Sequence, residues 1–200
     1  MSPLSSEEKL FLLRLARQAL SASVERGQRV PSGGGLAAKL DLKPAQLTPA
    51  LQQPAGAFVS LHKGGELRGC VGFVEPRLPL YRAVMETAAA AALRDPRFAP
   101  VRPEELPALE IEISVLSPSQ PVTVDAIEIG VHGLLVSQGR ARGLLLPQVA
   151  VERRWSPHRF LEETCHKAGL PFDAWRSGAR VEAFRAEVFG EKSQSNASDE

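Results

Sequence analysis

The run Leu-Arg-Gly-Cys-Val-Gly at residues 67–72 places a guanidinium and a thiol two positions apart in an apolar, β-branched stretch. Because side chains alternate between the two faces of a strand, Arg68, Cys70 and Gly72 share one face. A guanidinium at that distance favours the thiolate, the form in which cysteine acts as a nucleophile. Gly69 and Gly72 remove side-chain bulk, so a ligand or another backbone can approach the strand closely. Cys70 is therefore a candidate catalytic residue, and Arg68, Gly69 and Gly72 are candidate substrate contacts.

A structural role for Cys70 is the alternative, and we favour it. Free cysteine is among the most buried residue types and behaves as a small hydrophobic side chain. A tight turn at the glycines 64–65 would place Cys70 opposite Val59 in a packed hairpin. The same register would place Arg68 opposite Leu61.

An arginine in such a strand needs a carboxylate partner, because an isolated buried charge is very costly. Glu110 and Glu112 are the natural candidates, since they lie on the polar face of an alternating strand at residues 109–116. They would line a cavity beside Arg68 as candidate substrate-binding residues, or they would face water. Alternating glutamates more often face water.

Histidine, cysteine and glutamate also gather between His158 and His166, but their spacing does not predict a metal site. His158 and Cys165 lie about 10 Å apart along a helix axis, too far to share one ion. The glycines 33–35 lack the lysine and hydroxyl residue of a P-loop, and no strand precedes them as a dinucleotide fingerprint requires. We therefore expect no metal and no cofactor.

The elements that must hold these side chains alternate between helices and hairpins. The sequence pattern predicts helices over 6–25, from Pro79 to Asp95 and from Ser156 to Gly169, and strands over 57–62, 67–73, 109–116, 134–137, 143–146 and 181–189. The strands come as hairpins, not as single strands joined by crossover helices. This arrangement is typical of an α+β fold with antiparallel β-hairpins and flanking helices.

Composition limits the function classes. The 200 residues include 24 Lys and Arg and 23 Asp and Glu, which gives a net charge of +1. The overall electrostatic field of the protein is therefore too weak to bind a polyanion. The arginines 140, 142, 153 and 154 are not interleaved with aromatic residues, so nucleic acid is not an expected partner. No apolar run approaches the roughly 18 residues of a membrane helix, and the first ten residues include Glu7 and Glu8. We expect a cytoplasmic protein with no membrane partner.

The run at 67–72 differs by one Val-for-Ile change from the Leu-Arg-Gly-Cys-Ile-Gly signature of the AMMECR family, and the chain resembles that family throughout. Further blocks that look like the family are residues 95–98, 109–116 and 144–150, Trp155, residues 160–161 and residues 167–175. The resemblance covers an AMMECR-type domain at residues 6–190. The polar residues 191–200 are expected to form a disordered tail.

The resemblance implies two lobes around a cavity that the cysteine strand faces. It also implies kinship with the A component of the AmmeMemoRadiSam system, whose other components are a Memo-like protein and a radical SAM protein. One expected function is a binding or accessory component that acts with those partners and holds a small-molecule ligand. The other is an enzyme in which the Cys70 thiolate attacks the substrate, Arg68 holds this anionic substrate, and Glu110 or Glu112 transfers a proton. The lack of a second titratable group at motif spacing from Cys70 favours the first.

Overall fold

The computed structural model describes residues 3–26 and 46–192, and these form two compact units. The first unit contains Met1–Val115 and Glu187–Glu200, and the second contains Leu116–Ala186. The boundaries fall within two strands, β3 (Leu109–Leu116) and β7 (Arg180–Gly190), which therefore continue from one unit into the other. The glycines 33–35 lie outside the described residues.

Helix α1 (Ser6–Glu25) begins at a capping box, as predicted. The Ser5 hydroxyl accepts the N–H of Glu8 at 3.2 Å, and the Glu8 carboxylate accepts the N–H of Ser5 at 2.8 Å. These reciprocal bonds satisfy N–H groups that the start of a helix otherwise leaves without partners. The predicted boundaries of this helix are confirmed.

Helix α3 (Leu80–Leu93) follows Pro79 and ends before Asp95. Its alanines from Ala88 to Ala92 are buried, and their small side chains let the neighbouring strands approach the helix closely. A short α2 (Pro49–Gln52) precedes the sheet, and a 3-10 helix, η3 (Pro103–Ala108), leads into β3.

The predicted first hairpin is formed by β1 (Gly56–Lys63) and β2 (Glu66–Phe73). Gly64 and Gly65 have φ values of +60° and +86°, the left-handed pair that a tight two-residue hairpin turn requires. Next to the turn, Lys63 pairs with Glu66 and His62 with Leu67.

The predicted register is wrong beyond this point, because a β-bulge lies between Leu61 and His62. Leu61 pairs with Gly69, so Arg68 is the extra residue of the bulge and has no partner across the ladder. Cys70 consequently lies opposite Ser60, not opposite Val59.

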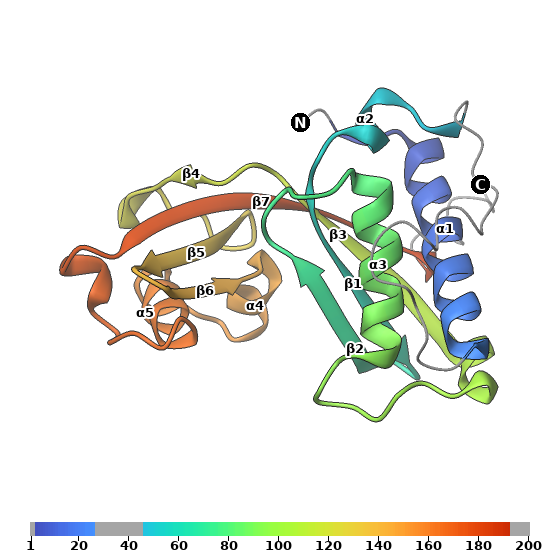
Figure 1. The fold of residues 1–200 in the computed structure, drawn as a ribbon. Helices are drawn as coiled ribbons and strands as arrows, with labels where there is room; N and C mark the ends of the chain where they lie inside the picture. The colour runs from blue at the N-terminus through green and yellow to red at the C-terminus, as the bar shows by residue number, and fades with distance from the viewer. Residues whose placement is uncertain (1–2, 27–45, 193–200) are drawn as a thin grey trace. The chain divides into compact units, whose positions relative to one another are not determined.

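In the first unit the strand order is β2-β1-β3-β7, which leaves β2 at the edge. Helices α1 and α3 lie on one face of this sheet, as Figure 1 shows. Four side chains on that face are each at most 1% exposed: Val59, Leu61, Ile111 and Ile113. The alternate residues of β1 and β3 therefore lie on the other face, which these two helices do not cover.

The second unit is built on the strand order β7-β5-β6, with β5 (His132–Gln138) and β6 (Ala141–Leu145) as the second predicted hairpin. Helix α5 (Pro157–Lys167) begins at Ser156, whose hydroxyl accepts an N–H at 3.2 Å, and packs on this hairpin. The pattern analysis missed α4 (Pro147–Glu152) and the two-residue β4 (Gln120–Pro121), which pairs with β7.

The predicted α+β class with antiparallel hairpins is confirmed by this architecture. No helix in the described parts of the chain has the length and apolar character needed to cross a membrane.

Candidate functional site

Arg68 makes an ion pair with Glu105 of η3. Its Nε lies 3.1 Å from Oε1 of Glu105 and its Nη2 lies 3.0 Å from Oε2, so the carboxylate is held by two parallel bonds. Nη1 of Arg68 also donates to the carbonyl oxygen of Ala99 at 2.9 Å. The expectation that Glu110 or Glu112 pairs with Arg68 is therefore wrong. The bulge explains the error, because it removes Arg68 from the regular alternation of β2.

The pKa of Glu105 is lowered to about 2 by the hydrogen bonds from Arg68, then by the backbone N–H of Arg102 and by Lys63. Nζ of Lys63 lies 3.0 Å from Oε1 of the same carboxylate, and the Arg68 and Glu105 side chains are each only 17% exposed. Arg68 and Lys63 thus hold the hairpin on η3 through the Glu105 carboxylate, which also caps the start of η3 by accepting the Arg102 N–H. The Arg68 guanidinium is engaged by the Glu105 carboxylate and the Ala99 carbonyl, and its predicted role in binding an anionic substrate stays a prediction.

The backbone of Cys70 is bound by the loop that follows α3. Its N–H donates to Oδ2 of Asp95 at 2.8 Å, and its carbonyl oxygen accepts from Nη2 of Arg97 at 3.3 Å. Arg97 and Asp95 are themselves joined at 2.7 Å. These bonds hold the pKa of the buried Asp95 well below its usual range, with the Arg97 side chain as the largest cause. Asp95 and Arg97 satisfy the backbone of an edge strand, where a neighbouring strand would otherwise be needed.

The Cys70 thiol is half-buried and lies 3.3 Å from the hydroxyl oxygen of Ser60, its partner across the hairpin. Among the described residues, no imidazole or carboxylate forms a hydrogen bond to its sulfur. Arg97 is the cation beside Cys70, since its Nη2 donates to the Cys70 carbonyl oxygen. The pKa of Arg97 is raised mainly by Asp95 and to a smaller extent by the Cys70 side chain. Sequence reasoning assigned that place to Arg68.

The two motif glycines are both sites of close approach, as expected. A Cβ atom on Gly69 would lie 2.2 Å from the carbonyl oxygen of Ala91 in α3, and one on Gly72 would lie 2.2 Å from the Phe58 ring. Both contacts are made by the protein itself, so they explain the glycines structurally.

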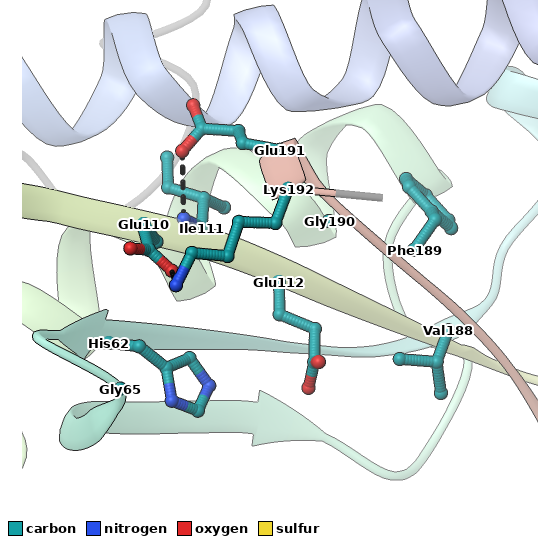
Figure 2. A pocket seen from close by; sticks show the side chains of 10 residues that line it. All are labelled: His62, Gly65, Glu110, Ile111, Glu112, Val188, Phe189, Gly190, Glu191 and Lys192. Atoms are coloured by element: carbon teal, nitrogen blue, oxygen red, sulfur yellow. Dashed lines mark hydrogen bonds and ion pairs between the residues drawn. The ribbon is translucent and has the colours of Figure 1, made fainter. Parts of the chain in front are cut away.

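A pocket of about 460 Å³ lies within the first unit on the side of the sheet that carries His62, Glu110 and Glu112 (Figure 2). These residues alternate with the buried Leu61 and Ile111, which explains why they share this side. The remaining lining residues are Gly65 and Ile111 together with residues 188–192 of the C-terminal segment. Arg68, Gly69, Cys70 and Gly72 do not line this pocket, so the structure separates the two glutamates from the cysteine motif.

The polar groups of the pocket differ in how they are paired. Nζ of Lys192 lies 2.8 Å from Oε2 of Glu110, as the dashed line in Figure 2 marks. Glu112 has no hydrogen bond or ion pair with the part of the chain that the structure describes. Nε2 of His62 is buried and has no hydrogen-bond partner within those same residues.

Glu191 belongs to the folded first unit, which corrects the expected start of the tail. Its carboxylate binds the Arg17 guanidinium, with Nε of Arg17 3.0 Å from Oε1, and accepts the backbone N–H of Ile111 at 2.8 Å. The composition of residues 191–200 gave no sign of this role, because Glu191 resembles the polar residues after it. Residues 193–200 lie outside the described residues.

Two histidines and the cysteine of the second unit are used in packing. His166 stacks on Phe172 with ring centroids 5.0 Å apart, and His158 meets Trp175 edge-on at 5.9 Å. Cys165 is fully buried, and burial raises the pKa of its thiol. Among the described residues, no three His, Cys, Asp or Glu side chains are grouped so that they could hold a metal ion.

Comparison with known proteins gives one consistent family. The family model described as AMMECR1 matches residues 13–189. A protein of Methanothermobacter thermautotrophicus is 44% identical over 198 residues, which cover 95% of this chain and 97% of that protein. A Thermofilum pendens protein is 42% identical, with 96% and 93% covered. The crystal structure of an uncharacterized protein from Pyrococcus horikoshii matches with a TM-score of 0.77 and 38% identity, covering 90% of each chain.

Proposed function

The chain belongs to the AMMECR1 family, and from that premise we propose that it is a cytoplasmic binding or accessory component that acts with a Memo-like protein and a radical SAM protein. The partners are proposed from the resemblance to the A component of the AmmeMemoRadiSam system. The pocket of the first unit is the proposed ligand site, since it is concave and presents groups that no described residue engages.

One observation carries the preference for binding over catalysis: the charged groups around Cys70 are already engaged by the fold. Arg68 is held by Glu105, and Asp95 is held by Arg97 and the backbone of Cys70. A thiol nucleophile normally has a general base within hydrogen-bond reach, and among the described residues the neighbours of the Cys70 side chain are the Ser60 hydroxyl and the Arg97 guanidinium, neither of which is a general base. The motif is thus explained by the stability of the hairpin and its edge.

The second candidate function, an enzyme with Cys70 as nucleophile, is favoured by Arg97. A guanidinium beside a thiol stabilises the thiolate, and Arg97 interacts electrostatically with this side chain. In that case Arg97, in place of Arg68, would activate the sulfur.

Both proposals are tested by combining the chain with the Memo-like and radical SAM proteins of its own host. We expect a complex in sedimentation velocity, formed by wild type and by Cys70→Ala with affinities that agree within about threefold. Cys70→Ser serves as a second variant, because its hydroxyl can still bond to Ser60. Absence of any complex with the wild-type chain would overturn the partner proposal. If the assembled proteins formed a reaction product with the wild-type chain but not with Cys70→Ala, the enzyme proposal would be established instead.

A further inference from the structure

The chain places an ammonium group of its own in the pocket of the first unit. Nζ of Lys192 lies 2.8 Å from Oε2 of Glu110, and Figure 2 shows the lysine side chain extending to that carboxylate. The Lys192 side chain is 71% exposed, whereas Glu110 is 33% exposed. An ion pair of this exposure contributes little to stability, so exchanging the contact with Glu110 for one with a ligand costs little. The contact shows that the pocket is chemically suited to an alkylammonium group.

The pocket has acceptors beyond the one that Lys192 uses. The Glu112 carboxylate lines it without a hydrogen-bond or ion-pair partner among the described residues. A carboxylate accepts several hydrogen bonds, and Lys192 occupies only part of the acceptor capacity of the pocket. An ammonium group has three N–H donors and no acceptor, so it matches this set better than a neutral or anionic group does.

The same pocket offers apolar contact beside the carboxylates. Val188, which is 44% exposed, and Phe189 come from the C-terminal end of β7 and line it together with Glu112. A volume of about 460 Å³ has room for a short alkyl chain as well as its charged end. The lining therefore fits a group that is cationic at its tip and apolar along its stem.

We propose that this pocket binds a primary ammonium on an alkyl chain, that Glu112 supplies its carboxylate, and that Lys192 competes with the ligand from within the chain. The inference rests on the proposed binding function and names the ligand class of that site. A free aliphatic diamine and a lysine side chain of a partner protein share this chemistry, and the experiment separates them.

Isothermal titration of the full chain with 1,5-diaminopentane and with a blocked Gly-Lys-Gly peptide tests the proposal. We expect one site in the first unit and no binding of 1,5-pentanediol, which has the same chain without charge. Glu112→Gln weakens binding about tenfold or more, because it removes a charged acceptor. Glu104→Gln is the matched control, since Glu104 is an exposed glutamate of η3 outside the pocket. It changes affinity by less than about twofold.

Lys192→Ala tests the competition directly, and we expect tighter binding by about threefold or more as the internal ammonium is removed. Binding of the peptide alone identifies a lysine of a partner as the ligand, and binding of the diamine identifies a small amine. Equal loss in Glu112→Gln and Glu104→Gln would reveal general charge attraction and overturn the site. A chain that forms the complex with its partners but binds neither amine would overturn this inference alone.

Discussion

Arg68 and Glu105 are joined by two parallel hydrogen bonds, and this pair fastens the β1–β2 hairpin to the 3-10 helix that leads into β3. The pair exists because Arg68 is the extra residue of a β-bulge. Without the bulge, Arg68 would lie opposite Leu61, which is fully buried against the helices. The bulge thus removes the charged Arg68 from the position opposite Leu61, which faces the core.

Glu105→Gln is expected to lower the free energy of unfolding by about 1–3 kcal/mol, because it leaves the mostly buried Arg68 without its charged partner. Lys63→Ala is the control, since the Lys63 side chain is 47% exposed and its bond to the same carboxylate contributes at most about 1 kcal/mol. Urea unfolding of both variants measures the difference. Equal effects would show that the Arg68 pair adds nothing beyond the Lys63 contact, because Glu105→Gln removes the charged partner of both cations.

Stability should depend on pH through the same carboxylate. The pKa of Glu105 is lowered from 4.5 to about 2 in the folded chain, and the pKa of Asp95 is also depressed. Groups with depressed pKa values stabilise the fold above their unfolded values, and this contribution is lost as the pH falls through the folded values. Unfolding free energies from pH 6 down to pH 2 should therefore decrease, and less steeply in Glu105→Gln. Parallel curves for the variant and wild type would contradict this assignment.

Gly69 is expected to tolerate no side chain. Alanine there would place its Cβ against the backbone carbonyl of Ala91. Because this carbonyl is fixed within helix α3, we expect the free energy of unfolding to fall by about 1–3 kcal/mol. Gly72→Ala is the matched comparison, because its Cβ would meet the ring of Phe58, a side chain that can turn away. Thermal melts should rank Gly69→Ala below Gly72→Ala. The reverse order would mean that α3 moves more easily than the ring.

The elements that local rules specify were predicted from the sequence. The capping box at Ser5, the glycine turn at 64–65 and the alternation in β3 each depend on residues a few positions apart, so helix α1, the hairpin and the strand are confirmed. The same rules placed Glu110 and Glu112 together on the face away from the core.

The contacts of the candidate site were not predictable in the same way. Glu105 reaches Arg68 from 37 positions along the chain, and Arg97 reaches the Cys70 carbonyl from 27. Such contacts depend on the bulge and on where α3 ends. Neither feature produces a periodic pattern of residue types in the sequence. Glu191 was placed in a tail because composition alone does not show that Arg17 binds it.

Truncation should separate the folded end of the chain from the residues beyond it. Removing residues 191–200 eliminates the Glu191 carboxylate and leaves Arg17 and the Ile111 N–H without that acceptor, so the melting temperature should fall by several degrees. Removing only residues 193–200 should leave it unchanged, since that segment contains no apolar residue larger than Ala197. A similar fall in both truncations would place further contacts in the last eight residues.

The last prediction concerns the Cys70 thiol. Iodoacetamide should label Cys70 in the folded chain, because this residue is half-buried, and should leave the fully buried Cys165 unlabelled until the chain unfolds. Arg97→Gln should slow the labelling of Cys70, since it removes the positive charge that interacts with this side chain. Arg68→Gln should have little effect, because the Arg68 guanidinium binds Glu105 and the Ala99 carbonyl and not the Cys70 side chain.

Site-resolved mass spectrometry gives the two rates in one experiment, with Cys165 as the internal measure of unfolding. If Arg68→Gln slowed labelling as much as Arg97→Gln while Cys165 stayed protected, the arginine of the motif would act on the thiol after all. Cys70→Ser and Cys70→Ala should unfold at similar temperatures, because the serine hydroxyl can bond to Ser60 across the hairpin and is not buried without a partner. A much less stable Cys70→Ser would show that the Ser60 contact cannot satisfy a hydroxyl at this position.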